Sequence, residues 1–201
     1  MTDKDLLQQG IVPGPGPLIH WIEQAKRGDI GAFQRIYELF VRKVLNFVYR
    51  MIGSPEEAED LTQETFVTVY QKLGSLKDDE RFEPWLFRIA RNNVYQRYRR
   101  RTPSMVSIDE QDEEGRSVAE LVDERKGPQE AFQAEELERV VQGVIDDLPD
   151  KYREVFVLSA IDHLSYQEIA EIVGRSLPSV KTDIHRARLQ VRKRVRDYLK
   201  D

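Results

Sequence analysis

Residues 164–188, LSYQEIAEIVGRSLPSVKTDIHRAR, contain two helix starts that are separated by a short turn. Ser165 and Glu168 form the sequence of a capping box, which predicts that a short helix begins here, and Gly174 suits the C-terminal cap of that helix. Pro178 favours the first turn of a longer helix. A short helix, a tight turn and a longer helix are the outline of a helix-turn-helix, which we predict at this end of the chain.

The longer helix is predicted to run to about Leu199 and to have two different faces. Its apolar face should pack against the preceding helices and consists of Val180, Ile184, Ala187, Val191 and Val195. In helix-turn-helix proteins the start of the second helix enters the major groove, where Arg and Lys pair with guanine edges or phosphates. The predicted DNA contacts are Ser179, Lys181, Thr182, Asp183, His185, Arg186, Arg188 and Arg192.

Within this set, Arg186 and Lys181 are the best candidates for reading bases, whereas Arg188 and Arg192 are expected to contact phosphates and position the helix. The helix N-terminus near Ser179 could also receive a phosphate. The alternative is a solvated basic face on a surface helix. The capped helix, the glycine turn and the proline start together favour DNA binding.

Helical patterns also fill most of the chain before this motif. Helices are predicted at residues 18–26, 29–52, 54–73, 83–101, 129–146 and 148–162. Residues 74–82 read as a polar loop without a helical period. No segment alternates in the manner of a strand, so the predicted fold class is all-α.

Two changes of composition divide the chain. Residues 1–17 end in PGPGP, which cannot form a helix or join a strand, and are predicted to be a flexible tail. Residues 104–130 are strongly acidic and interrupted by Gly and Pro, so they are predicted to be a flexible linker. We therefore expect two small helical domains, at residues 18–103 and 131–201.

Composition excludes several classes of function. The 201 residues include no cysteine, which excludes disulfides and thiolate chemistry, and the three histidines lie far apart, which argues against a zinc site. No phosphate-binding loop or nucleophile–base set is present, so we expect no enzyme, no metal and no cofactor. No apolar stretch could span a membrane and no signal sequence opens the chain, so a cytoplasmic protein without direct membrane insertion is expected.

The charge is distributed unevenly along the chain. The formal net charge of −5 argues mildly against nucleic-acid binding. However, basic residues concentrate at 88–101 and 181–200, with the acids between them. A net-negative protein with two basic patches should bind DNA weakly when alone and should need a larger partner to hold it in place.

The helix predicted at residues 83–101 mixes arginines with aromatic residues. Its arginines are Arg88, Arg91, Arg97, Arg99, Arg100 and Arg101. Its aromatic residues are Trp85, Phe87, Tyr95 and Tyr98. This mixture suits single-stranded nucleic acid, in which bases stack and phosphates need countercharge. Trp85, Leu86 and Ile89 are instead expected to be core residues.

The helix predicted at residues 54–73 begins with acids. Glu56 and Glu57 are expected there from the helix dipole alone. Asp60, Gln63 and Glu64 lie beyond the first turn and form a polar face. Such a face could dock a basic protein surface.

Five stretches of the sequence resemble one known family. Residues 60–66 (DLTQETF) and 82–92 (FEPWLFRIARN) resemble the hallmark stretch of extracytoplasmic-function (ECF) sigma factors. Residues 164–170 and 180–188 resemble the promoter-binding helix-turn-helix of the same family, and residues 26–33 resemble its usual opening. The resemblance covers residues 18–198 without the linker, in the family's order and spacing.

The resemblance implies core RNA polymerase, promoter DNA and an anti-sigma factor as partners. It implies that the clamp helices of the largest polymerase subunit bind Asp60, Leu61, Gln63, Glu64, Phe66 and Val67. The C-terminal domain would sit on the flap of the second subunit and read the minus-thirty-five element. The acidic linker would run through the RNA exit path.

Recognition and melting of the minus-ten element are implied for the N-terminal domain. The residues that match this role are Leu76, Lys77, Asp78, Asp79, Arg88, Arg91, Asn92, Gln96, Arg97 and Arg100. The loop at 74–82 resembles the segment that captures a flipped base, with Asn92 and Gln96 lining that pocket. Extruding a base costs a few kcal/mol, so such a pocket has a physical purpose.

Asp183 departs from the family, in which many members have a basic or neutral residue. An acid here could repel phosphate, accept from cytosine, or pair with Arg186 or a nearby basic residue. A stand-alone helix-turn-helix regulator is the main alternative function, but it leaves the helices at 54–73 and 83–101 unexplained. An enzyme or a protein-interaction adaptor has less support.

Overall fold

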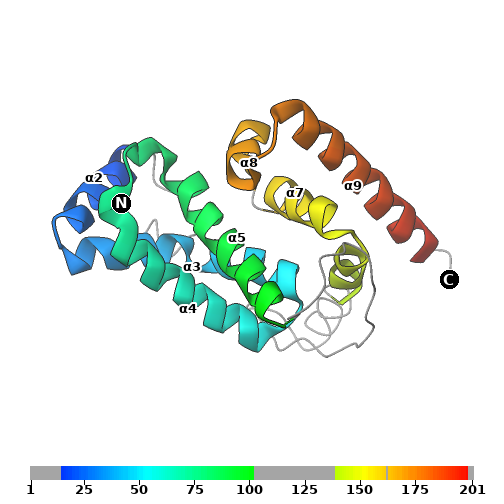
Figure 1. Ribbon diagram of the computed structural model, residues 1–201, viewed down its shortest axis with the longest axis horizontal. Helices are drawn as coiled ribbons and strands as arrows, with labels where there is room; N and C mark the ends of the chain where they lie inside the picture. Colours follow the sequence, from blue (N-terminus) through cyan, green and yellow to red (C-terminus); the bar gives the residue numbers. More distant parts are fainter. Residues whose placement is uncertain (1–14, 102–138, 162, 199–201) are drawn as a thin grey trace, which may run out of the picture.

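The computed structural model describes residues 15–101, 139–161 and 163–198, and these ranges contain helices and turns but no strand (Figure 1). The predicted all-α fold is therefore confirmed. The α-helices are α2 (Pro15–Lys26), α3 (Ile30–Ile52), α4 (Pro55–Lys72), α5 (Phe82–Arg101), α7 (Asp150–Ala160), α8 (Tyr166–Val173) and α9 (Leu177–Tyr198), and residues 139–146 are also helical.

Local signals place the helix ends in the N-terminal half. Asp29 caps α3 by accepting a hydrogen bond from the backbone N–H of Ala32 at 3.0 Å. Gly53 ends α3 with a φ of 76°, a conformation that glycine adopts without steric cost. Ser54 then caps α4, which has Pro55 in its first turn. The sequence predicted each of these ends.

The start of α2 differs from the prediction. The helix begins at Pro15 rather than after Pro17, so residues 15–17 do not belong to a tail. The first turn of a helix has no intrahelical use for its N–H groups, and the fixed φ of proline matches the helix. Prolines that would break a helix interior are therefore compatible with its first turn.

Aromatic residues build the core of the N-terminal bundle. The Phe40 and Phe82 rings lie 5.3 Å apart, and those of Phe47 and Phe87 lie 5.6 Å apart, so α5 is packed against α3. The segment before α5 is not a purely polar loop. It forms 3₁₀ turns at Leu73–Ser75 and Asp79–Arg81, and Leu76 is buried.

In the C-terminal half, α7, α8 and the first half of α9 share an apolar core. Val180, Ile184 and Ala187 are buried there, as their spacing predicted. Val195, two turns after Ala187, is 38% exposed, because the end of α9 extends past α7 and α8 (Figure 1). The predicted apolar face therefore packs only along the first half of the helix.

The two halves pack against each other. Helix α8 lies on α5, and α7 lies on α3, so the buried apolar residues of both halves form one cluster. The predicted linker at 104–130 lies outside the described residues. No described helix is both long and apolar enough to cross a bilayer.

Candidate nucleic-acid interface

The helix-turn-helix forms as predicted. Ser165 Oγ accepts from the Glu168 N–H at 3.3 Å, and Glu168 Oε2 accepts from the Ser165 N–H at 2.8 Å, which completes the capping box. Gly174 ends α8 with a φ of 68°, so the chain turns sharply into α9. These local bonds fix the angle at which α9 leaves α8.

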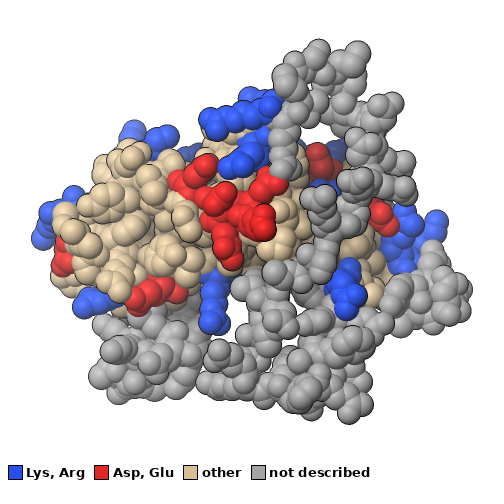
Figure 2. All heavy atoms as spheres, turned by 90° about the horizontal axis from the view of Figure 1, so that it is seen from below, with Lys and Arg blue, Asp and Glu red and all other residues tan. Residues whose placement is uncertain are grey.

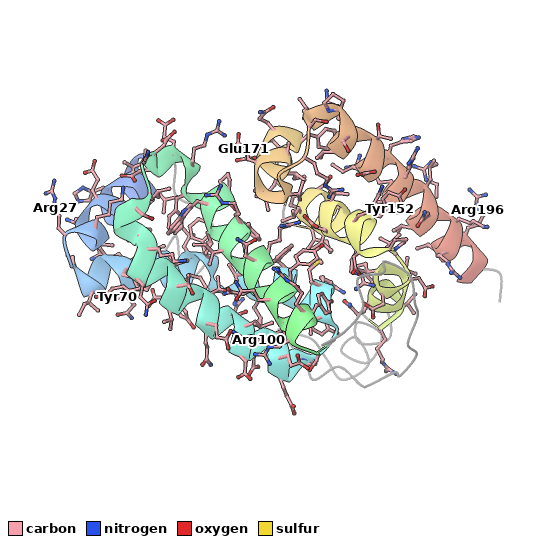
Figure 3. All side chains as sticks on the ribbon, in the orientation of Figure 1. Arg27, Tyr70, Arg100, Tyr152, Glu171 and Arg196 are labelled. Carbon is pink, nitrogen blue, oxygen red and sulfur yellow. The ribbon has the colours of Figure 1, made fainter. Side chains whose placement is uncertain are left out.

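The face of α9 that is turned away from the core is basic. Its exposed polar residues are Lys181, Thr182, His185, Arg186, Arg188 and Arg192, whereas Ser179 is half-buried. Arg186 donates to the phenol oxygen of Tyr152, which is labelled on α7 in Figure 3, at 3.4 Å. That hydrogen bond raises the pKa of Arg186 above its ordinary value.

Arg188 is held in place by two other helices. Its guanidinium donates to the Tyr166 Oη at 3.2 Å and to the Ser159 Oγ at 3.0 Å. Fixing a long side chain before it binds reduces the entropy that binding costs. Arg188 is therefore positioned in advance, as a phosphate contact would need to be.

Asp183 is not on the exposed face of α9, contrary to its place among the predicted contacts. It is only 4% exposed, accepts from Arg175 Nη1 at 2.8 Å, and lies 3.6 Å from the Lys151 ammonium. Of the alternatives that the sequence left open, pairing with a nearby basic residue is the correct one. The partners are Arg175 and Lys151 rather than Arg186.

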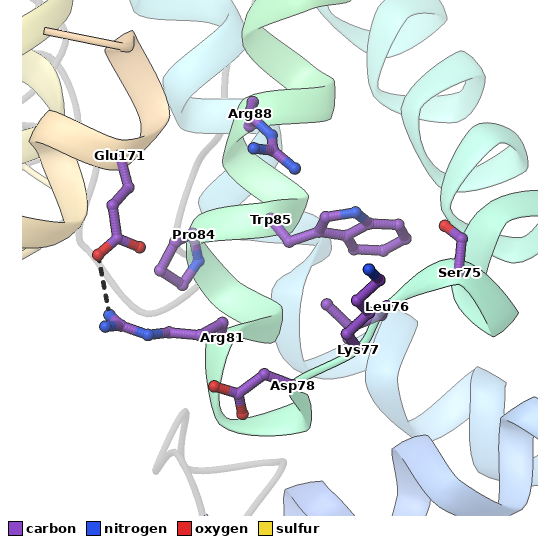
Figure 4. Close-up of a pocket in the computed structure, with 9 residues that line it drawn as sticks. All are labelled: Ser75, Leu76, Lys77, Asp78, Arg81, Pro84, Trp85, Arg88 and Glu171. Atoms are coloured by element: carbon purple, nitrogen blue, oxygen red, sulfur yellow. Dashed lines mark ion pairs between the residues drawn. The ribbon is translucent and has the colours of Figure 1, made fainter.

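A pocket opens between the loop before α5 and the start of that helix. Figure 4 shows the Trp85 ring beside Lys77 and Leu76, with Arg88 one turn further along α5. The other residues that line it are Ser75, Asp78, Arg81, Pro84 and Glu171. Lys26 holds the loop in place, because its ammonium donates to the Leu76 carbonyl at 2.7 Å and to Asp79 at 2.5 Å.

Two residues that the resemblance placed in this pocket lie elsewhere. Asn92 is exposed on α5, one turn after Arg88, and is not among the lining residues. Gln96 lines a second groove, between α4 and α5, together with Asp60, Gln63, Glu64, Val67, Thr68 and Asn93. Residues three or four positions apart lie on the same face of a helix. Gln96 lies beyond the part of α5 that is next to the loop, so it does not reach the pocket.

The arginines of α5 have different environments. Arg88 and Arg100 are exposed, and Arg97 donates to Glu64 at 3.4 Å. Arg91 is instead bound by Glu154 of α7, whose carboxylate accepts from Arg91 Nε at 2.7 Å. The core roles expected for Trp85, Leu86 and Ile89 are confirmed, because Leu86 is buried and both Trp85 and Ile89 are partly buried against the core.

Glu154 is the residue that the sequence did not reveal. It is 1% exposed, and it also accepts from the Tyr95 phenol at 2.7 Å. Burial, followed by the negative charge of Glu154, raises the pKa of Tyr95 well above its ordinary value. The residues around Glu154 do not indicate this role, because its partners Tyr95 and Arg91 are 59 and 63 residues away in the sequence.

The surface of α4 combines acidic and apolar residues. Asp60, Gln63, Glu64 and Val67 are exposed, whereas Leu61 and Phe66 are buried, so the last two stabilise the core and do not offer a docking surface. Acidic side chains gather in the middle of the face that Figure 2 shows, along the lower edge of the molecule in Figure 1.

Beside the acidic part of α4 lies an exposed apolar patch, which comprises Ile30, Tyr37, Val67 and Tyr70. The Tyr37 ring contacts Phe66 at 4.8 Å between centroids, and Tyr70 contacts Phe33 at 4.9 Å. Of these residues, only Val67 is among those that the resemblance assigned to polymerase binding. The Tyr37 ring lies at the rim of the contact between α3 and α4.

Comparison with known proteins gives matches in both halves. Residues 36–103 match the family described as Sigma-70 region 2, and residues 138–191 match Sigma-70, region 4. The ECF RNA polymerase sigma factor SigW of Bacillus subtilis (strain 168) is 39% identical over 178 residues, which are 88% of this chain and 95% of SigW.

Two solved structures share the fold. CnrH, in complex with the cytosolic domain of CnrY, is 25% identical with a TM-score of 0.68, over 90% of this chain and 98% of CnrH. The sigma factor RpoE of Bartonella quintana, in complex with the anti-sigma factor NepR, is 20% identical with a TM-score of 0.63, over 83% of this chain and 98% of RpoE.

The matches distinguish between the two predicted functions, a sigma factor and a stand-alone helix-turn-helix regulator. A stand-alone regulator would account for the region 4 match but not for the match to region 2. SigW matches along nearly its whole length, across both halves. The chain therefore belongs to the ECF family of RNA polymerase sigma factors, which direct the polymerase to promoters.

Proposed function

We propose that the chain divides the work of promoter recognition between its two halves: residues 18–103 bind polymerase and open the minus-ten element, and residues 131–201 read the minus-thirty-five element. The observation that carries this proposal is the pair of matches to Sigma-70 regions 2 and 4. The chain itself catalyses nothing, and it acts in the cytoplasm, where the polymerase works.

The polymerase contact is assigned to the exposed side of α4. Asp60, Gln63 and Glu64 supply acceptors for a basic surface, and Val67 and Tyr70 supply exposed apolar area beside them. Protein interfaces typically have an apolar centre that is surrounded by polar residues. We assign it to the clamp helices of the largest subunit, and the C-terminal domain to the flap of the second.

Opening of the minus-ten element is assigned to the pocket of Figure 4 and to the arginines of α5. The indole of Trp85 offers a flat apolar surface for a base, and Lys77 and Arg88 offer countercharge for the phosphates next to it. Asp78 and Asp79 shape the loop. Asn92, Arg97 and Arg100 follow on the same helix and are assigned to the adjoining strand.

Reading of the upstream element is assigned to the exposed face of α9. Lys181 and Arg186 lie within the first turns of the recognition helix, where side chains reach base edges. Arg188, held by Tyr166 and Ser159, is assigned to a phosphate. Asp183 is removed from the predicted contacts because it is buried.

Regulation by an anti-sigma factor is also proposed. RpoE, which shares the fold, was solved with such a partner. Binding of a partner to either half would compete with polymerase or with DNA, because these assigned surfaces cover much of both halves.

The test is run-off transcription from fragmented DNA of the source genome, with core polymerase and with or without the protein. We expect new, discrete start sites that share two spaced upstream elements. Arg186→Ala should weaken use of the upstream element only, and Val67→Asp should reduce all new transcripts. If no new transcripts form with active core polymerase, or if the protein binds duplex promoter tightly without it, the proposal is wrong.

A further inference from the structure

The loop between α4 and α5 is tied to the bundle by a lysine of α2. Lys26 is the last residue of α2, and its ammonium donates to the Leu76 carbonyl at 2.7 Å and to Asp79 Oδ1 at 2.5 Å. The two acceptors flank Lys77 and Asp78, which line the pocket of Figure 4. Lys26 itself is not among the lining residues. A single ammonium therefore fixes both ends of one wall of the pocket from outside it.

Few other contacts hold this wall. Leu76 is buried, but the residues on either side of it are exposed, namely Gly74, Ser75, Lys77 and Asp78. Among the described residues of the N-terminal half, the other side-chain hydrogen bonds of the loop join residues at most three positions apart. Such bonds shape each turn but do not fix where the loop lies on the bundle.

The other wall of the pocket does not depend on Lys26. Trp85 belongs to the first turn of α5, and the Phe82 ring at the start of that helix is fully buried in the aromatic core. Lys43 of α3 binds Glu83 in the same turn at 2.8 Å. Loss of Lys26 should therefore leave the indole in place and loosen only the loop beside it.

The ion pair also neutralises an acid of the loop. The side chains of Lys26 and Asp79 are 22% and 19% exposed, so both are largely withdrawn from water. A free carboxylate on a loop that meets DNA would repel the phosphates, whereas a carboxylate paired with an ammonium has its charge balanced. A loop that is already ordered also costs less entropy on binding than one that the ligand must order.

We propose that Lys26 is a positioning residue for promoter opening: it holds the loop in the shape that receives an extruded base, and it does not touch DNA itself. The inference rests on the proposed function of the pocket. It extends the melting site to α2, which lies before the residues that match Sigma-70 region 2, since that match begins at residue 36.

The test measures binding of the holoenzyme, the chain with core polymerase, to a fluorescein-labelled single-stranded oligonucleotide. The oligonucleotide carries the minus-ten sequence that run-off transcription identifies, and in further copies each nucleotide in turn is abasic. One abasic position should weaken binding by the parent most, because it offers no base to the pocket. Lys26→Met should bind the intact oligonucleotide roughly tenfold more weakly, because binding must then order the loop, and should bind that abasic copy as the parent does.

Salt dependence separates positioning from a direct contact. Each phosphate contact on a single strand contributes about 0.7 to the slope of log affinity against log salt concentration. Lys26→Met should leave this slope unchanged, since the Lys26 ammonium is bound to Asp79, whereas Lys77→Met should reduce it by about that amount. A reduced slope in Lys26→Met would overturn the inference, because Lys26 would then contact DNA.

Further variants keep the test valid if Lys26→Met lowers stability. Asp79→Asn breaks the ion pair from the side of the loop, keeps the bond to the Leu76 carbonyl, and should weaken binding less. The double variant should bind as Lys26→Met does, because both changes remove the same bond. Arg27→Gln removes an exposed charge from the next position, which makes no side-chain bond within the described residues, and should behave as the parent does. Circular dichroism checks that each variant keeps its helices.

The behaviour of the parent distinguishes two failures. If no abasic position weakens binding by the parent holoenzyme, the base pocket of the proposed function is wrong, and the inference fails with it. If the parent discriminates, and a folded Lys26→Met holoenzyme binds the intact and the abasic oligonucleotides as the parent does, only the inference is overturned.

Discussion

The buried acid in the recognition helix offers the sharpest test of the C-terminal half. Asp183 accepts from Arg175 at 2.8 Å, lies 3.6 Å from Lys151, and is almost fully buried. The change Asp183→Asn keeps the shape of the side chain and removes its charge. It should therefore weaken the contact that ties the turn after α8 to α9.

The magnitude follows from the exposure of the partners. Breaking a fully buried ion pair costs about 3–5 kcal/mol, and a hydrogen bond to a charged group contributes about 1.5–3 kcal/mol. The side chains of Arg175 and Lys151 are 25% and 56% exposed, so water screens part of the charge. We expect the free energy of unfolding to fall by about 2 kcal/mol, which lowers the Tm of a domain of this size by roughly 10 °C.

The assay is urea denaturation followed by circular dichroism. Asp147→Asn is the matched control, because Asp147 pairs with Arg194 at 3.4 Å on the surface, where both side chains are about half exposed. Its effect should stay within about 0.5 kcal/mol. A stable Asp183→Asn protein that prefers different promoter bases would refute the reasoning, since Asp183 would then be a DNA contact.

Three further predictions concern other parts of the molecule. Arg186→Ala should weaken recognition of the upstream element by about 1–3 kcal/mol in a promoter-binding assay with holoenzyme, and an unchanged base preference would remove Arg186 from that role. Phe87→Ala should lower the free energy of unfolding by about 3–5 kcal/mol, because Phe87 is fully buried against Phe47; a smaller loss would mean that the bundle collapses around the gap. Burial raises the pKa of Tyr95, so the stability that its bond to Glu154 contributes is complete below about pH 10, the ordinary phenol value, and is lost as the pH rises above it. The free energy of unfolding should therefore fall more steeply above about pH 10 in the parent than in Tyr95→Phe, and equal slopes in urea denaturation would contradict the assignment.

Features that depend on neighbouring residues were predictable from the sequence. The caps at Asp29, Ser54 and Ser165 and the glycine ends at Gly53 and Gly174 lie where the sequence placed them. Each depends on a bond between groups at most four residues apart. The basic face of α9 was predictable for the same reason, since helical spacing alone decides which residues share a face.

Features that depend on distant partners were not predictable. Leu61 and Phe66 fit the family's polymerase-binding segment, but the helical bundle buries both side chains. Asp183 shares a helix with the residues assigned to DNA, yet α7 supplies Lys151 beside it. Glu154 becomes significant only when α7 lies against α5, and nothing in residues 139–161 indicates that contact.

Arg188 has a consequence for engineering new promoter specificity. Because it bonds to Tyr166 and Ser159, it ties α9 to α8 and α7, and any replacement would disturb the scaffold together with the contact. Lys181 and His185 are exposed, and neither makes a side-chain bond within the described residues. A library that randomises Lys181 and His185 and leaves Arg188 intact should therefore yield folded factors with altered targets far more often than one that includes all three positions.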